Sequence, residues 1–88
     1  HFIKGKNINL QILHNQNLEK SIGVGYTATK KIGNAVKRNK AKRIMRELAR
    51  KIIINGKINS YYVLIAKSSL LDEKFNNLLA ELKEKLND

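Results

Sequence analysis

The sequence contains no cysteine, no proline and no tryptophan among its 88 residues. Without cysteine there is no disulfide, no thiolate zinc site and no cysteine nucleophile. The two histidines, His1 and His14, stand far apart in the sequence, so we expect no metal site. Residues 61–66 form the longest apolar run, well short of the roughly 20 residues that cross a bilayer. We therefore expect a cytoplasmic protein that neither spans nor binds a membrane.

Acidic residues are scarce as well. Seven Asp and Glu stand against 18 Lys and Arg, which gives a formal net charge of +11. Such an excess of one sign destabilises a compact chain by self-repulsion, and its usual cause is a polyanionic partner. That partner is either nucleic acid or an anionic membrane surface. Hydrophobic residues make up 42% of the chain, too many for a disordered basic tail. With no proline-rich or low-complexity linker to divide it, residues 1–88 are predicted to form a single domain.

The order of hydrophobic patterns predicts an α+β fold. Apolar and polar residues alternate over 8–13, and a second strand pattern covers 21–29. The spacing is helical over 32–54 and again over 71–86. Between these helices, the continuous apolar run 60–67 suits a strand that is covered on both faces. We expect a small β-β-α-β-α sandwich, with helices packed on a sheet.

The strand predicted over 21–29 has one large and one small face. The large face carries Ile22, Val24, Tyr26 and Ala28, and the small face carries Ser21, Gly23, Gly25 and Thr27. Glycine inside a strand weakens it and often marks the close approach of a ligand or of another part of the chain. Both explanations of the small face stay open from the sequence.

The long helical pattern over 32–54 has a well-defined apolar face. Within an arc of about 140° lie Ala41, Ile44, Met45, Leu48, Ala49 and Ile52. Asn34 is the expected N-cap of this helix. From both helical patterns and the apolar strand, we expect the core to contain Leu48, Ile52, Leu64, Phe75 and Leu79.

The opposite face of the same helix is basic. It carries Asn39, Arg43, Arg46 and Arg50, with Lys40 and Lys42 at its edges. Over residues 30–51, ten Lys and Arg stand against Glu47 alone, so this segment carries +9 of the net charge. A solvated helix normally interleaves both signs. This face therefore indicates a site for phosphates, which guanidinium groups bind bidentately.

No catalytic or metal-binding constellation emerges from the acidic residues. They are Glu19, Glu47, Asp72, Glu73, Glu81, Glu84 and Asp88. A hydrolytic nuclease needs clustered carboxylates for a metal or a general acid–base pair. Neither pattern lies near the basic helix, so we expect no catalytic residue in this chain.

Residues 30–47 resemble the signature of the protein subunit of bacterial ribonuclease P. In that family a strand ending in Val-Gly runs into a KK[IV]GNAV segment, and the next helix carries an Arg-Asn-Arg motif and a KRxxR run. This chain reads KKIGNAV over 30–36, then Arg38-Asn39-Lys40, and then Lys42-Arg43 with Arg46. Lys40 departs from the motif, because lysine keeps the charge and loses the bidentate geometry of arginine.

The resemblance adds two expectations about the fold. It implies a left-handed crossover between the strand before the basic helix and the strand after it, where the general rule predicts a right-handed one. The family also has an N-terminal helix with aromatic residues, which would be largely absent here, with residues 2–5 as its tail.

The resemblance also implies a function. The chain would be the RNA-binding protein subunit of ribonuclease P, an accessory subunit of an endoribonuclease. The catalyst would be the partner RNA, which holds Mg²⁺ and removes the 5′ leader from precursor tRNA, while the protein alone binds no cofactor. Its partners would be that RNA and the leader, and not DNA. The alternative is a ribosomal or other structural RNA-binding protein of similar fold.

Two sets of site residues follow from the charge pattern and the resemblance. The predicted RNA-binding residues are Lys30, Lys31, Asn34, Arg38, Asn39, Lys40, Lys42, Arg43, Arg46 and Arg50. The candidates for a cleft that holds the leader are Phe2, Gly23, Gly25, Tyr26 and Thr27. Tyr26 lies on the strand face opposite the glycines, so the two cannot line one cleft, and the choice between them stays open.

Overall fold

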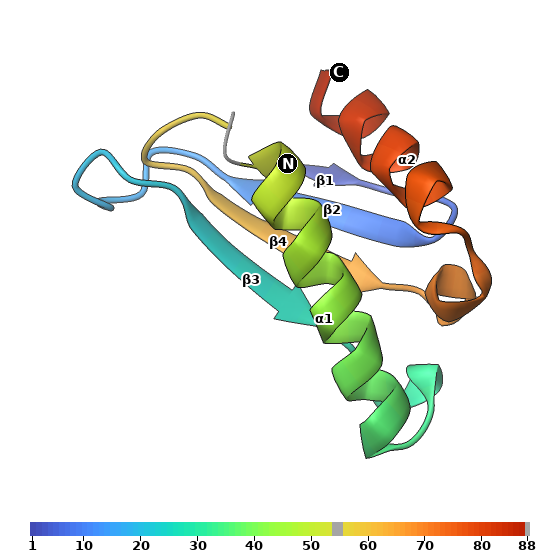
Figure 1. The fold of residues 1–88 in the computed structure, drawn as a ribbon. Helices are drawn as coiled ribbons and strands as arrows, with labels where there is room; N and C mark the ends of the chain where they lie inside the picture. Colours follow the sequence, from blue (N-terminus) through green and yellow to red (C-terminus); the bar gives the residue numbers. More distant parts are fainter. Residues whose placement is uncertain (54–55, 88) are drawn as a thin grey trace.

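Two helices cover one face of a four-stranded sheet in the computed structural model, which describes residues 1–53 and 56–87 (Figure 1). The strands are β1 (Phe2–Ile3), β2 (Ile8–Leu13), β3 (Gly23–Thr27) and β4 (Tyr61–Ala66). The helices are α1 (Ala35–Ile52) and α2 (Phe75–Asn87), and each follows a short 3₁₀ turn, η1 (Lys30–Ile32) and η3 (Ser68–Asp72). The predicted α+β class and the β-β-α-β-α order are confirmed, with the short strand β1 in addition.

The strand order in the sheet is β1-β2-β4-β3. Strands β3 and β4 are parallel, and the other neighbouring pairs are antiparallel. The chain leaves β3, passes through α1 in front of the sheet and returns in β4, and this crossover is left-handed (Figure 1). The hand implied by the resemblance is therefore confirmed, against the general preference for right-handed crossovers.

Strand β4 is covered on one face only, which corrects the expectation of a strand covered on both. Its buried residues Tyr62, Leu64 and Ala66 alternate with residues that are half-buried, Tyr61, Val63 and Ile65. Strand β2 alternates in the same way, with Ile8, Leu10 and Ile12 buried. The helices pack on the buried side, so the other side of the sheet is open. We call this second side the open sheet face.

The glycines of β3 lie on the open sheet face, beneath a tyrosine. In the parallel register Gly23 pairs with Tyr61, and Gly25 pairs with Val63. A Cβ atom added at Gly25 would lie 2.6 Å from the hydroxyl oxygen of Tyr61, and one added at Gly23 would collide with the same ring. The small face predicted for this strand is therefore occupied by a neighbouring side chain.

Helix α1 starts later than its hydrophobic pattern suggests. Residues 30–32 form the turn η1, and Gly33 follows with φ 138°, a conformation that strains any residue with a side chain. Asn34 then caps the helix, as predicted, because its side chain accepts a hydrogen bond of 3.0 Å from the backbone N–H of Lys37. The predicted end of the helix at residue 54 lies outside the described residues.

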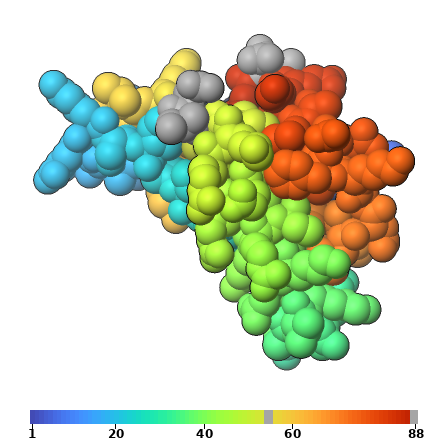
Figure 2. Space-filling view, in the orientation of Figure 1, coloured from blue at the N-terminus to red at the C-terminus, as the bar shows by residue number. Residues whose placement is uncertain are grey.

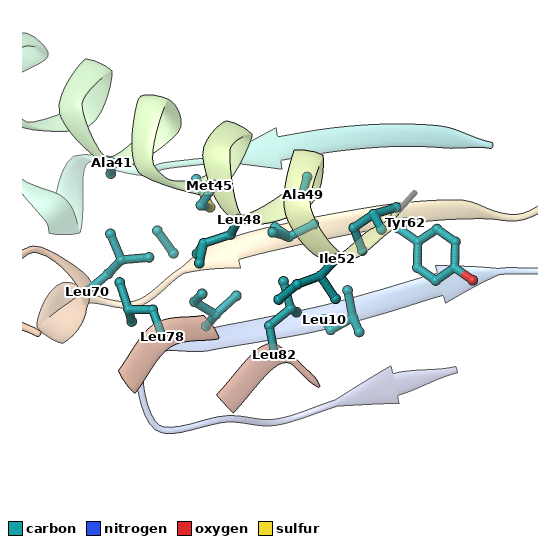
Figure 3. Packing of buried hydrophobic residues seen from close by; sticks show 14 of the residues in the cluster. Leu10, Ala41, Met45, Leu48, Ala49, Ile52, Tyr62, Leu70, Leu78 and Leu82 are labelled. Carbon is teal, nitrogen blue, oxygen red and sulfur yellow. The ribbon is translucent and has the colours of Figure 1, made fainter. Parts of the chain in front are cut away.

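The core lies between the helices and the sheet (Figure 3). From α1 it takes Ala41, Met45, Leu48, Ala49 and Ile52, while Ile44 is only partly buried. Of the five expected core residues, Leu48, Ile52 and Leu64 are buried. Phe75 and Leu79 are only half-buried, because α2 turns Leu78 and Leu82 toward α1 and β2 instead. Phe75 and Leu79 still pack against the core, so they lie at the edge of the buried stripe of α2 and not at its centre.

A buried polar network ties α2 to the turn between β1 and β2. The carboxylate of Glu81 accepts hydrogen bonds from the backbone N–H groups of Asn7 and Ile8, at 3.0 and 3.1 Å. It also accepts one of 2.9 Å from the side-chain amide of Asn7, whose oxygen accepts a bond of 2.7 Å from the Ser69 hydroxyl. Lys85 lies 3.8 Å from the same carboxylate. Ser69 therefore joins the turn η3 to this network.

At the start of α2, Glu73 makes two local hydrogen bonds. Its carboxylate accepts from the Asn77 side chain at 2.8 Å and from the backbone N–H of Lys74 at 3.0 Å. Because both bonds favour the charged form, they lower the pKa of Glu73 below its usual value. The free N–H groups at this helix end are thus satisfied in part by an acid.

Replacing Leu82, which is fully buried, should be far more damaging than replacing its half-buried neighbour Leu79. Truncation of a buried leucine to alanine typically costs about 2–5 kcal/mol of unfolding free energy. A domain of this size has about 5 kcal/mol to lose. We expect Leu82→Ala to be largely unfolded at 37 °C and Leu79→Ala to remain folded, as followed by thermal denaturation with circular dichroism. Equal losses would show that α2 packs in a different phase.

Candidate RNA interface

The N-terminal half of α1 projects beyond the sheet together with η1 (Figures 1 and 2). Nine of the ten predicted RNA-binding residues are exposed, and they extend from η1 into the C-terminal half of α1, while Arg38 is half-buried. The nine are Lys30, Lys31, Asn34, Asn39, Lys40, Lys42, Arg43, Arg46 and Arg50. The apolar stripe of α1 is held against the sheet, so these side chains point to solvent. We call them, with Lys37, the basic face of α1.

The charge of the basic face is almost uncompensated. Arg50 donates a hydrogen bond of 3.0 Å to the carboxylate of Glu47, and both side chains are solvent-exposed. Within the described residues, no other Lys or Arg of η1 or α1 lies within 4.0 Å of a carboxylate. The face therefore keeps its positive charge available for an external anion.

Two local hydrogen bonds shape the entry to this face. The hydroxyl of Thr29 accepts a bond of 3.3 Å from the backbone N–H of Lys31, and Asn34 caps α1 through Lys37. Because Asn34 uses its carbonyl oxygen as a cap, its amide NH₂ group is the part left to contact RNA. These bonds hold Lys30 and Lys31 next to the first turn of α1.

One exposed apolar residue of this segment escaped the sequence analysis. Val36 is 76% exposed in the first turn of α1, between the cap and Lys37. Its position off the apolar stripe of the helix is the signal that could have marked it. An exposed valine among cations offers apolar contact to a sugar or base, where the cations bind phosphates.

The candidates for a leader cleft separate onto two sides of the sheet. Gly23, Gly25 and Thr27 share the open sheet face, and Phe2, which pairs with Gln11 in the register and is 49% exposed, shares it with them. Tyr26 lies on the helix side, where it packs against the core. The ring beside the glycines belongs to Tyr61, which the sequence analysis missed because a continuous apolar run does not reveal which residues face which side.

A search of the described residues finds no group of three or more histidine, cysteine or acidic side chains that could hold a metal ion. Within the same part of the chain, no helix is long and apolar enough to cross a membrane. The feature that remains is a cationic helix displayed by a sheet whose far side is open. Together these define the class of the molecule, an α+β domain that displays a cationic helix on its surface, as nucleic-acid-binding domains do.

Comparison with known families makes the assignment specific. The family model described as Ribonuclease P matches residues 1–88. The ribonuclease P protein component of Caulobacter vibrioides is 42% identical over 67 residues, which cover 75% of this chain and 45% of that protein. The corresponding protein of Ruegeria pomeroyi is 45% identical over 67 residues, covering 74% of this chain and 54% of that protein. The chain belongs to the ribonuclease P protein family and spans about half the length of these relatives.

Solved structures show the same fold. The RNase P protein of Staphylococcus aureus superposes with a TM-score of 0.78 at 24% identity, over 99% of this chain and 77% of that one. The RNase P protein from Thermotoga maritima gives a TM-score of 0.82 at 19% identity, over 98% and 80% of the two chains. At these identities, the likeness concerns the arrangement of helices and strands.

Neutralising single cations of the basic face should weaken binding to a bacterial ribonuclease P RNA without unfolding the domain. The slope of log affinity against log salt should fall by about 0.7–0.9 for each phosphate contact that is lost. We expect this for Arg43→Ala and Arg46→Ala, measured by filter binding across a salt series. Arg46→Lys should recover the slope but only part of the affinity, because the ammonium group cannot bind bidentately.

The matched control for this series is Lys83→Ala, since Lys83 is exposed on α2, away from the basic face. Lys85 is unsuitable as a control, because its side chain is only 12% exposed and pairs with Glu81. If Lys83→Ala lowers affinity and slope as much as Arg46→Ala does, net charge governs binding and the assignment of a defined face fails.

Proposed function

We propose that this chain is the RNA-binding part of a ribonuclease P protein subunit, which assists a catalytic RNA in removing the 5′ leader from precursor tRNA. The observation that carries the proposal is the uncompensated basic face of α1, within a chain that belongs to this family. That face would bind the catalytic RNA, with Arg38, Asn39 and Lys40 at its centre. The protein would act in the cytoplasm, where precursor tRNA is processed.

Catalysis would reside in the RNA partner. Glu47, the acid closest to the basic face, is paired with Arg50. Glu81 is occupied by backbone and side-chain donors from Asn7 and Ile8. These carboxylates are therefore engaged in structural roles, and the Mg²⁺ that phosphodiester cleavage needs would be held by the RNA. The protein would contribute by binding and orienting RNA.

The open sheet face is the proposed site for the leader. It combines two aromatic side chains, Phe2 and Tyr61, with the polar side chains of Asn9, Gln11 and Thr27. Bases of a single strand stack on aromatic rings with little sequence preference, and amides donate and accept hydrogen bonds at their edges. Gly23 and Gly25 support this arrangement, because their lack of side chains lets the Tyr61 ring lie close to the sheet.

The alternative function, a ribosomal or other structural RNA-binding protein, predicts the same basic face. It does not predict any effect on the cleavage of precursor tRNA. A reconstitution experiment therefore separates the two.

The chain alone should cleave no RNA, and it should stimulate a bacterial ribonuclease P RNA. We expect no product when the purified chain is incubated with precursor tRNA and Mg²⁺, and faster 5′ cleavage when the chain is added to the RNA. Arg46→Ala should lose the stimulation at moderate salt. Cleavage by the chain unaided, abolished by Glu47→Gln, would place catalysis in the protein; binding without stimulation would favour a purely structural role.

Replacing Tyr61 should weaken the contact with the leader selectively. Removing one base–aromatic stack costs about 1–3 kcal/mol, so Tyr61→Leu should reduce affinity for precursor tRNA in the reconstituted complex by roughly tenfold. Affinity for the same tRNA without a leader should not change. A second variant, Tyr61→Phe, keeps the ring and should retain most of the preference. Equal weakening for both tRNAs would show that Tyr61 acts on something other than the leader.

A further inference from the structure

A groove of about 530 Å³ lies between β3 and the C-terminal half of α1. Strand β3 is at the edge of the sheet, so the groove is open along one side of the molecule. Its apolar walls include Val24 and Tyr26 from β3, and Ala49 and Ile53 from the end of α1. We call it the β3–α1 groove.

The rim of this groove is cationic. Lys20, Arg46 and Arg50 line it, and none of its described lining residues is acidic. Arg50 forms an ion pair with Glu47. By contrast, Arg46 and Lys20 have no carboxylate within 4.0 Å in the described part of the chain. An apolar floor below a cationic rim suits a ligand with a flat apolar part and an attached anion.

A nucleotide fits this description better than a peptide or a duplex. Its base can contact the apolar walls while its phosphate meets Arg46, and the groove volume is in the range of small-ligand sites. A duplex backbone would meet the cations and leave the floor empty. An added peptide strand would bond the outer edge of β3 in the plane of the sheet, whereas the groove lies on the helix side of that strand.

Tyr26 gives the groove the means to hold a base. Its ring lines the groove, and its hydroxyl group has no hydrogen-bond partner within 3.5 Å among the described residues. The ring can therefore stack on a base, and the hydroxyl can bond a base edge. The side chain points to the face of β3 opposite Gly23 and Gly25, so this site is separate from the open sheet face.

We propose that the β3–α1 groove binds one unpaired nucleotide of the catalytic RNA, with the base against Tyr26 and the phosphate on Arg46. The proposal rests on the proposed function, because Arg46 belongs to the face that meets that RNA. At this site the protein would contact a base, whereas the basic face alone would contact only phosphates. The bound RNA would thus be anchored by shape at an unpaired position, in addition to being attracted by charge.

The direct test is a photo-cross-link. A bacterial ribonuclease P RNA transcribed with sparse 4-thiouridine is bound to the chain and irradiated, and the attached residue is identified by mass spectrometry. We expect attachment at Tyr26 or its groove neighbours from this RNA, and none there from a precursor tRNA that carries 4-thiouridine only in its leader. Attachment at the groove from the leader alone, or attachment of the RNA only at Phe2 and Tyr61, overturns the proposal.

Affinity measurements separate the base contact from the charge contact. Tyr26→Leu keeps an apolar side chain and should lower affinity for the same RNA roughly tenfold, with the salt slope unchanged. Arg46→Ala should lower both affinity and slope. Lys83→Ala, which lies on α2 outside both proposed sites, should leave this affinity nearly unchanged. If Tyr26→Leu binds like the unaltered chain, no base occupies the groove, and the proposal fails.

Two controls keep the result interpretable. Tyr26→Phe retains the ring and should retain most of the affinity; if Tyr26→Leu is unstable by thermal denaturation, the cross-link on the unaltered chain and the Tyr26→Phe affinity decide the question. Failure of the proposed function looks different: the unaltered chain would then not stimulate cleavage. If the Tyr26→Leu variant stimulates cleavage as fully as the unaltered chain, only the proposed nucleotide site in the groove is contradicted.

Discussion

The structure depends on the burial of one helical stripe against one side of a sheet. Met45 and Leu48 of α1 are fully buried, and each such side chain contributes about 1.5–3 kcal/mol through the area it removes from water. The exposed pair between Arg50 and Glu47 contributes at most about 1 kcal/mol. Packing therefore decides how α1 is rotated, and the charges follow. The same rotation that closes the core presents Arg43 and Arg46 outward, so the position of the basic face follows from the packing of the helix.

The sheet order has a further effect, because it leaves β3 at an edge with both of its faces close to solvent. One face carries Gly23 and Gly25 beneath the ring of Tyr61, and the other carries Tyr26 beside α1. A single five-residue strand thus separates two surfaces with different chemistry. One short element therefore borders the Tyr61 ring on one side of the sheet and a groove with a cationic rim on the other.

The sequence alone predicted an element correctly where its hydrophobic pattern was long and was consistent with only one structure. The 18 residues of α1 repeat their apolar positions over several turns, and Asn34 has the side chain that a helix start requires, so the phase and the cap were both predictable. Helix α2 was harder. Its sequence pattern is a broad apolar stripe, made of Phe75 and the leucines at 71, 78, 79, 82 and 86. Only the contacts of α2 with α1 and β2 show that Leu78 and Leu82 occupy the centre of this stripe.

Other features depend on which strands pair and in which register, and a local sequence pattern does not contain this information. The run 60–67 holds adjacent tyrosines, and the register with β2 and β3 decides that Tyr62 enters the core while Tyr61 lies over the glycines. The start of α1 shifted because η1 and the positive φ of Gly33 interrupt a hydrophobic spacing that otherwise reads as continuous helix. The hand of the crossover came from family resemblance, since general topology favours the opposite hand.

The network around Glu81 joins parts of the chain that are 74 residues apart in sequence. It links the β1–β2 turn through Asn7, the turn η3 through Ser69, and α2 through Glu81 itself. None of these segments can separate from the others without exposing or orphaning a buried polar group, which is costly. They are therefore expected to open together in local unfolding, and the amide protons of Asn7 and Ile8 should then exchange with solvent about as slowly as those in the middle of α2. The projecting start of α1 makes none of the hydrogen bonds of this network, so its opening is not tied to theirs.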